Sequence, residues 1–207
     1  MSTRNQNLRI TDPNFFTIHA TELAQKLLGK ILVRNVNGQL TKVRIVETEA
    51  YDGKIDRACH AHLENRSRWK SAALNNRGGC AYVYLIYYRY HCFNIASSIK
   101  GEPQGVLIRA AEPLDHHTIP VPSQHDQGKK FHYYTNGPGK LCRALNIDIS
   151  LNHVDLTTSD LIYLENQPEL NPNQIVATTR VNIDYAGEDK NRLWRFYIKD
   201  NHFVSRK

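Results

Sequence analysis

The chain has 207 residues, of which 41% are hydrophobic and 23% are charged. These fractions exclude global disorder and suit one globular domain that buries a core of its own. The 27 basic residues outnumber the 20 acidic ones and give a net charge of +7, which favours a polyanionic partner, although many proteins with other partners are equally basic.

Segments that would place the chain in a membrane or outside the cell are missing from the sequence. No apolar run reaches the roughly 20 residues of a membrane-spanning helix, and residues 1–7 lack the apolar stretch of a secretory signal. The four cysteines are too few and too scattered for a disulfide scaffold. We therefore expect an intracellular protein that is not bound to a membrane.

The first third of the chain carries clear signals for secondary structure. We expect a polar tail over residues 1–14, followed by one domain over residues 15–207. Thr21 is a candidate N-cap for a helix over residues 22–28, which Gly29 would end. A strand follows at residues 30–36, and Asn37-Gly38 predicts a tight hairpin turn into a second strand at residues 43–51.

The rest of the chain alternates apolar runs with turn signals and has no internal repeat. The pattern predicts an α+β domain. The segments that it indicates are a basic stretch at 56–79 with a short helix at 69–74, a tyrosine-rich segment at 82–94, a strand at 105–111, a surface loop at 115–130, a short helix at 140–145 entered through residues 137–139, and final strands at 195–198 and 203–205.

Two glutamates and a group of tyrosines suggest the chemistry. Glu47 and Glu49 lie two residues apart in the strand at 43–51, so both project from the same face. A carboxylate on a half-buried strand is costly unless it is paired or has a function. The tyrosines of the segment 82–94 offer flat rings that suit nucleobases. In a basic protein this combination indicates hydrolysis at a nucleobase.

Seven segments in order carry a resemblance to a known family. They are residues 23–30, 44–51, 56–60, 81–94, 106–113, 137–141 and 195–198. The chain resembles the 3-methyladenine DNA glycosylase family of the alkyladenine type, which is found in bacteria and animals. The resemblance implies one compact domain with a curved, mostly antiparallel sheet, flanking helices and a protruding hairpin that inserts into the minor groove of DNA.

The resemblance also implies an activity and a partner. The expected enzyme is a monofunctional DNA N-glycosylase of base excision repair, which flips alkylated purines out of double-stranded DNA and hydrolyses the N-glycosidic bond, leaving an abasic site. It would use no metal and no other cofactor, and it would act in the bacterial cytoplasm or the eukaryotic nucleus. We expect a monomer, since the sequence has no extended apolar seam for a partner chain.

The resemblance assigns the catalytic roles to two residues. Loss of the base builds positive charge on the sugar, so a carboxylate can both activate water and stabilise the cation. Glu49 matches the general base, and Arg109 matches the arginine that helps to hold the water. Glu47 is expected to support the structure. The alternative for Glu49 and Arg109 is a buried ion pair without a catalytic role.

The resemblance also assigns a base pocket and a wedge. Tyr51, His60 and Tyr84 match the pocket lining, and a π-rich slot favours a cationic base over a neutral one. Asn94 matches a residue that crowds the exocyclic amine of guanine. Tyr87 matches the residue that intercalates where the nucleotide has left the stack.

Ordinary packing is the alternative for these aromatic residues, and for Tyr82 and Tyr90 it is the better interpretation. His60 would then be a hydrogen-bonded core residue. With Cys59 and His62 it could also be a zinc ligand, but this spacing supplies at most three ligands, so we expect no metal site.

The sequence departs from the family pattern at four places. Tyr88 follows Tyr87 where the family has glycine, and Arg180-Val181-Asn182 stands where the family has Arg-Ile-Gly. Residues 65–69 and 73–74 replace the family's Thr-Pro-Arg-Asn and Met-Phe elements, and residues 115–130 have no counterpart.

Two other functions remain open from the sequence. One is a non-catalytic protein that binds damaged DNA on the same scaffold, which the retained Glu49 disfavours. The other is an unrelated enzyme that acts on free nucleosides, which the basic excess disfavours because a nucleoside has no phosphate backbone.

Overall fold

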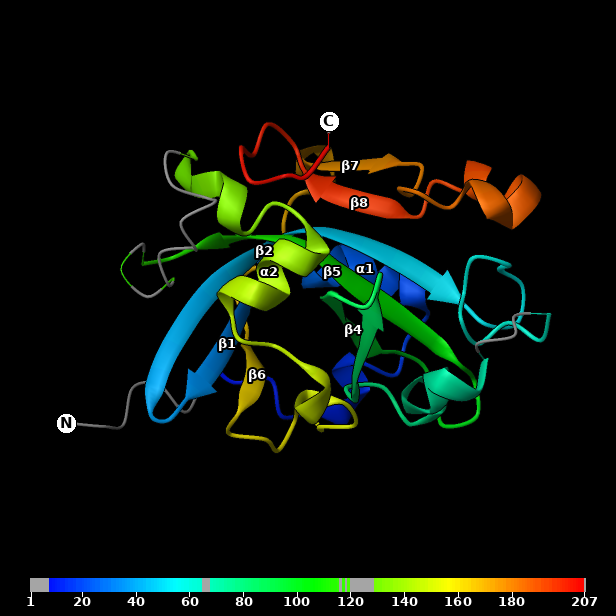
Figure 1. Cartoon of the computed structure of the whole chain (residues 1–207), viewed down its shortest axis with the longest axis horizontal. Helices are drawn as coiled ribbons and strands as arrows, with labels where there is room; N and C mark the ends of the chain where they lie inside the picture. The colour runs from blue at the N-terminus through cyan, green and yellow to red at the C-terminus, as the bar shows by residue number, and fades with distance from the viewer. Residues whose placement is uncertain (1–7, 65–67, 116, 118, 120–128, 207) are drawn as a thin grey trace.

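The computed structural model describes residues 8–64, 68–115, 117, 119 and 129–206. Within these residues eight strands form one sheet, flanked by helices on both sides (Figure 1). The strands are β1 Ile31–Val36, β2 Gln39–Asp52, β3 Ala81–Ile86, β4 Tyr90–Ala96, β5 Gln104–Pro113, β6 Ile162–Glu165, β7 Ile175–Thr178 and β8 Arg195–Ile198. The helices are α1 Ala20–Leu27 and α2 Pro138–Ala144, with 3-10 helices at Pro13–Phe15, Arg68–Asn75, Phe131–Tyr134, Ile149–Leu151, Pro172–Gln174 and Asp184–Asn191.

The sheet is antiparallel throughout and has β2 at its centre. The strand order is β3-β4-β5-β2-β1-β6, and β8 pairs with both β2 and β7. β2 is 14 residues long and curves across the molecule in Figure 1. Its first half pairs with β1 and its second half with β8 on the same edge, so β2 changes partner just before the paired glutamates. The α+β fold with a curved antiparallel sheet is confirmed.

Helix α1 buries its apolar face against β2 and β5. Leu23 and Leu27 have no exposed surface, and the Thr48 hydroxyl of β2 donates to the Ala24 carbonyl at 2.9 Å. The prediction of Thr21 as N-cap is wrong. His19 is the N-cap, and its Nδ1 accepts from the Thr21 N–H at 3.3 Å. A second ring nitrogen of His19 contacts Asp52 at 3.2 Å, so a tertiary contact holds the capping ring in place.

The turns around β1 are confirmed. Gly29 ends α1 with φ of +83°, a conformation that glycine adopts without strain. Asn37 and Gly38 form the tight turn between β1 and β2 with φ of +53° and +87°.

Three other predicted elements differ from the structure in their boundaries or in their type of secondary structure. The helix expected at 140–145 is α2, which begins two residues earlier because Pro138 suits the first helical turn. The helix expected at 69–74 is a 3-10 helix, Arg68–Asn75. The strand expected at 203–205 is wrong, because these residues form turns and bends whose polar groups bond to side chains.

The two ends of the domain and one loop fall partly outside the described residues. Residues 1–7 of the expected tail lie outside, whereas Ile10 is buried and its N–H donates to the Leu164 carbonyl at 2.9 Å. Most of the loop expected at 115–130 and residues 65–67 also lie outside the described part. Among the helices that the structure describes, none is long and apolar enough to cross a membrane.

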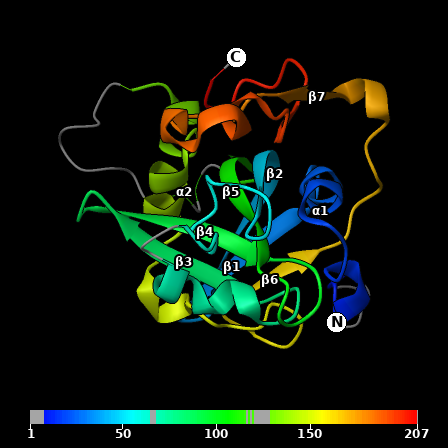
Figure 2. The ribbon, with the colours of Figure 1, turned by 90° about the vertical axis from the view of Figure 1, so that its right-hand side faces the viewer.

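Strands β3 and β4 form a hairpin that extends beyond the sheet at one side of the molecule (Figure 2). Ile86 pairs with Tyr90, so the tip consists of Tyr87, Tyr88 and Arg89. The base of the hairpin joins the sheet through the pairing of β4 with β5.

Candidate active site

The pairing of β2 with β5 is irregular where the two glutamates lie. Ile45 is opposite Ala111, Glu47 is opposite Ala110 and Thr48 is opposite Ile108. Arg109 on β5 therefore has no residue directly opposite. Such irregularities redirect side chains and are common beside functional sites. Here the irregularity brings the Arg109 side chain to both carboxylates.

Arg109 connects the two glutamates, neither of which has exposed surface. Its Nε donates to Glu47 Oε1 at 3.0 Å, and one terminal nitrogen lies 3.3 Å from Glu49 Oε2. Burial disfavours the charge of the guanidinium, but the attraction of Glu49 and then of Glu47 outweighs burial and raises the pKa of Arg109. The expected pairing of Glu49 with Arg109 is thus present in the structure.

Glu49 receives two further hydrogen bonds. The Tyr51 hydroxyl donates to Oε2 at 2.7 Å, and the Val181 N–H donates to Oε1 at 2.8 Å. Burial, followed by the negative charge of Glu49, raises the pKa of Tyr51 well above its ordinary value. The phenol therefore stays protonated and acts as a donor. These contacts fix the direction of both carboxylate oxygens.

Glu47 accepts hydrogen bonds from Arg109 and from residues of β8 and the last described residues of the chain. It accepts from Arg109, from Arg195 at 2.8 Å and from the Ser205 hydroxyl at 2.9 Å, and the Ser205 N–H donates to its second oxygen at 2.6 Å. This set of donors agrees with the supporting role expected for Glu47.

A buried ion pair lies behind Tyr51. Arg180 donates to both oxygens of Asp56, at 2.5 and 2.8 Å, and to the Ala50 carbonyl at 3.0 Å. Its guanidinium also lies 4.7 Å from the centre of the Tyr51 ring. The pair anchors the segment that carries the Val181 N–H and so connects it to Glu49.

A pocket of about 370 Å³, counting the space at its mouth, opens beside Tyr51. Its lining includes four residues that were predicted from the sequence, namely Tyr51, His60, Tyr84 and Asn94. It also includes residues without a predicted pocket role, namely Ala58, Cys59, Leu74, Tyr82, Gly105 and Tyr185.

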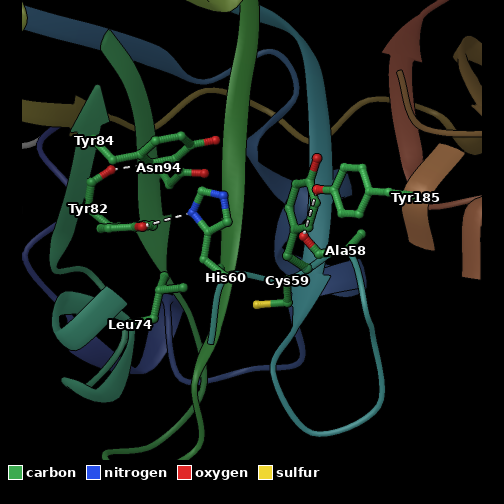
Figure 3. A pocket seen from close by; sticks show the side chains of 10 residues that line it. Ala58, Cys59, His60, Leu74, Tyr82, Tyr84, Asn94 and Tyr185 are labelled. Carbon is green, nitrogen blue, oxygen red and sulfur yellow. Dashed lines mark hydrogen bonds between the residues drawn. The ribbon is translucent and has the colours of Figure 1, made fainter. Parts of the chain in front are cut away.

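The walls of the pocket are mainly aromatic, as Figure 3 shows. Tyr82, Tyr84 and Asn94 of the hairpin stand on one side, and Tyr185 stands on the other. The His60 ring meets the Tyr84 ring edge to face at 4.5 Å, and its Nδ1 lies 3.0 Å from the Tyr82 hydroxyl. The interpretation of Tyr82 as ordinary packing is therefore incomplete, because this residue both packs and orients His60.

Asn94 and Tyr90 both belong to β4, but Asn94 lines the pocket whereas Tyr90 packs against α2. The Asn94 amide donates to the Tyr82 carbonyl at 3.1 Å, which holds it in the pocket wall. Tyr90 packs close to Gly139 of α2, where a Cβ on the glycine would come within 3.0 Å of Tyr90. Tyr90 is thus a packing residue, as expected.

Three predicted site residues do not line the pocket. Glu49 and Arg109 are buried behind Tyr51, which contacts both Glu49 and the pocket. Tyr87 lies at the hairpin tip, where 79% of its surface is exposed. The structure therefore separates the candidate site into a buried charge cluster, an aromatic pocket and an exposed tip.

The described residues give no sign of a metal centre. Among them, no group of three or more histidine, cysteine, aspartate or glutamate side chains is arranged to hold an ion. The four cysteines are buried thiols. Burial raises the pKa of Cys59, which lines the pocket, to about 12, so this thiol stays protonated and is a poor metal ligand at neutral pH.

Four residues that contact the candidate site were given no role in the sequence analysis, although two of them lie in segments that it singled out. Arg195 lies in a segment that carries the family resemblance, and Val181 lies in a segment that departs from it. Tyr185 and Ser205 had no such signal, because nothing local in the sequence links them to Tyr51 or Glu47.

Comparison with known proteins identifies the family of the chain. A family model described as "Methylpurine-DNA glycosylase" matches residues 14–202. A protein of Natranaerobius thermophilus named "Putative 3-methyladenine DNA glycosylase" is 45% identical over 194 residues, covering 94% of this chain and 98% of its own length. Proteins with the same name from Clostridium tetani and Clostridium botulinum are 45% and 46% identical, each covering 93% of this chain and 97% of its own length.

Proposed function

The chain belongs to the methylpurine-DNA glycosylase family, and on this premise we propose that it removes alkylated purines of the 3-methyladenine type from double-stranded DNA. The proposed reaction is hydrolysis of the N-glycosidic bond, which leaves an abasic site and does not cut the DNA strand. The proposed partner is damaged duplex DNA, bound by a monomer.

One observation carries this proposal. Glu49 lies 3.3 Å from Arg109 and accepts a 2.7 Å hydrogen bond from Tyr51, a residue of the aromatic pocket wall. Tyr51 thus connects the proposed general base Glu49 and its neighbour Arg109 to a pocket that suits a flat purine. This combination suits a base seated in the pocket while its sugar faces Glu49.

In the proposed mechanism, the flipped purine enters the pocket among Tyr51, His60 and Tyr84. An alkylated purine carries positive charge, which a π-rich slot favours and which weakens the glycosidic bond. The base leaves with the bonding electron pair, and positive charge develops on the sugar. A water molecule then adds to the sugar carbon and transfers a proton to Glu49.

The buried position of Glu49 sets a requirement for this mechanism. Tyr51 is the pocket residue that contacts Glu49, so the attacking water has to reach the carboxylate beside the Tyr51 hydroxyl. The Arg109 guanidinium can donate to that water, and the Tyr51 oxygen, whose one hydrogen goes to Glu49, can accept from it. Asn94 adds selectivity in this scheme by crowding the exocyclic amine of guanine, so that normal guanine is disfavoured in the pocket.

The first test is the variant Glu49→Gln on a methylated duplex oligonucleotide. Loss of a general base reduces rates by about 10²–10⁴-fold, so single-turnover excision should fall by at least that range while duplex affinity is retained. Excision is measured as strand cleavage after alkali. Glu165→Gln is the matched control, because Glu165 is also buried but pairs with Lys42.

Two outcomes would reject parts of the proposal. Wild-type excision rates in Glu49→Gln would remove this residue from the mechanism. Wild-type protein that binds methylated duplex but produces no alkali-labile sites would favour a role in damage binding without catalysis.

A further inference from the structure

We propose that Tyr88 gives the hairpin tip a second aromatic contact with the DNA base stack, next to the wedge assigned to Tyr87. The inference rests on the proposed function, because it assumes that the tip meets a duplex from which a nucleotide has been extruded. It assigns Tyr88 to recognition of paired DNA and not to the chemistry of excision.

The exposure of Tyr88 is the first observation. Its surface is 100% exposed, and that of Tyr87 is 79% exposed, whereas Tyr82 is 2% exposed and Tyr84 lines the pocket. An aromatic side chain that touches nothing in its own chain contributes little to folding. Buried against a partner, the same ring would remove about 150–200 Å² from water.

The backbone at the tip is the second observation. Tyr87 and Tyr88 have φ of +50° and +53°, a region that glycine and asparagine adopt readily and bulky side chains avoid. Elsewhere in the described chain, the non-glycine residues with positive φ are Asn37, Ser98, Asn146, His153, Asn182 and Asp200. The hairpin tip is thus the place where two large rings occupy this strained conformation in succession. These are also the values that a two-residue hairpin turn requires, and the Arg89 N–H closes this turn by donating to the Ile86 carbonyl at 3.0 Å, so the turn holds both rings at its exposed corners.

The position of the tip relative to the pocket is the third observation. Tyr84 lines the pocket, and β3 ends at Ile86, two residues or about 7 Å further along at 3.3 Å per residue, so Tyr87 begins the turn just beyond. A duplex whose extruded base occupies the pocket therefore lies across the tip, which projects from the molecule in Figure 2. Tyr87 would fill the gap in the stack, and Tyr88 would stack on an adjacent base.

The charge of the tip favours nucleic acid over a protein partner. Arg89 follows Tyr88 directly, and its guanidinium lies 5.4 Å from the centre of the Tyr90 ring. The chain as a whole has a net charge of +7. Flat rings next to a cation are the usual combination for base stacking beside a phosphate backbone.

The test compares Tyr88→Asn with Tyr88→Phe. Asparagine tolerates positive φ but lacks the ring, whereas phenylalanine keeps both the ring and the strain. The probes are a duplex with a tetrahydrofuran abasic analogue for equilibrium affinity, and methylated duplex and single strands for single-turnover excision. Urea unfolding of each variant is measured in parallel.

Tyr88→Asn should bind the abasic duplex about tenfold more weakly, which is the size expected for loss of one stacked base. Its excision from single strands should be unchanged, and its urea midpoint should be equal to or above that of the wild type because strain is relieved. Tyr88→Phe should stay within about twofold of the wild type in all assays. A combined Tyr87→Ala change should multiply the loss on duplex.

Wild-type duplex affinity in Tyr88→Asn would overturn the inference, and so would an equal loss in Tyr88→Phe, which would assign the effect to the hydroxyl. These outcomes are separable from failure of the proposed function. If the wild type excises no base, the affinity comparison still decides whether Tyr88 contacts the duplex.

Discussion

Glu47 and Glu49 differ in their neighbours more than in their position in the sequence. Both are fully buried and both contact Arg109. Glu47 is surrounded by Arg195 and the main-chain and hydroxyl groups of Ser205, whereas Glu49 contacts the pocket residue Tyr51. Glu47 therefore positions Arg109, whereas Glu49 is the carboxylate that contacts the pocket wall, as the proposed mechanism requires.

Glu47→Gln tests this division at the level of single residues. The change leaves Arg109 and Arg195 without their shared anion, and breaking a buried pair in this way costs about 3–5 kcal/mol. We expect the free energy of unfolding to fall by about that amount and kcat to fall as Arg109 loses its anchor. Urea unfolding and single-turnover excision measure the two effects.

Glu165→Gln is the control for this prediction as well. Glu165 pairs with Lys42, whose side chain is 30% exposed and can be hydrated when the partner is lost. Because Lys42 can be hydrated, we expect a smaller loss of stability than in Glu47→Gln and no change in excision. Equal losses in both variants would contradict the special role of Glu47.

At the level of elements, local signals in the sequence predicted the turns and the sheet. Gly29 and Asn37-Gly38 adopt the positive φ that their chemistry favours, and the hairpin signal located β2, although β2 begins at Gln39 and not at Val43. His19 replaced Thr21 as N-cap because its ring also contacts Asp52, which is 33 residues away. A contact of that kind has no signature in a window of neighbouring residues.

In the candidate site, too, some features were predicted from the sequence and others depend on contacts between distant residues. The strand pattern placed the two glutamates on one face, and the family resemblance supplied Arg109, His60 and Tyr84. The resemblance could not supply the two contacts of Glu47 with Ser205, since Ser205 is 158 residues away and belongs to a segment without regular structure. Such contacts depend on how β8 and the last residues pack on β2.

The segment at Arg180-Val181-Asn182 supplies a test at this scale. Asn182 has φ of +60° and follows Val181, whose N–H donates to Glu49 at 2.8 Å. Glycine, which the family has at this position, would keep the geometry. Asn182→Val should cost about 1–3 kcal/mol of backbone strain and should also lower kcat, because the Val181 N–H moves.

Asn146→Val is the matched control for Asn182→Val. Asn146 also has positive φ, at +49°, and is also exposed, but it is not among the residues that line the aromatic pocket or contact Glu49. Its replacement should lower the urea midpoint without changing the excision rate at a temperature where both variants are folded. Loss of activity in both variants to the same extent would argue against a specific role of the Val181 N–H.

At the scale of the whole molecule, the pocket region buries an unusual set of weak acids. Burial raises the pKa of Cys59 to about 12 and that of Cys92 to about 11, and it raises the pKa values of Tyr51 and Tyr84 well above their ordinary range. All four groups are neutral in the folded protein at neutral pH. The fold therefore tolerates them only while they keep their protons.

This burial predicts alkaline instability that begins near pH 9. In the unfolded chain the thiols lose protons near their ordinary pKa of 9, whereas in the folded protein Cys92 and Cys59 keep them to about pH 11 and 12. Between these values the unfolded state binds fewer protons, so stability falls as pH rises, by up to ~1.4 kcal/mol per pH unit for each group. Below pH 9 this contribution is constant.

Urea unfolding under reducing conditions from pH 7 to pH 11 measures this dependence. The free energy of unfolding should fall with increasing slope above pH 9, and Cys59→Ala should reduce that slope by up to ~1.4 kcal/mol per pH unit, because one buried thiol no longer titrates. Lys54→Ala is a control on the surface, since its side chain is 55% exposed and it pairs with Glu102 outside the pocket. A profile that stays flat to pH 11, or a slope that Cys59→Ala leaves unchanged, would contradict the prediction and would show that the thiol beside the pocket reaches solvent in the folded protein.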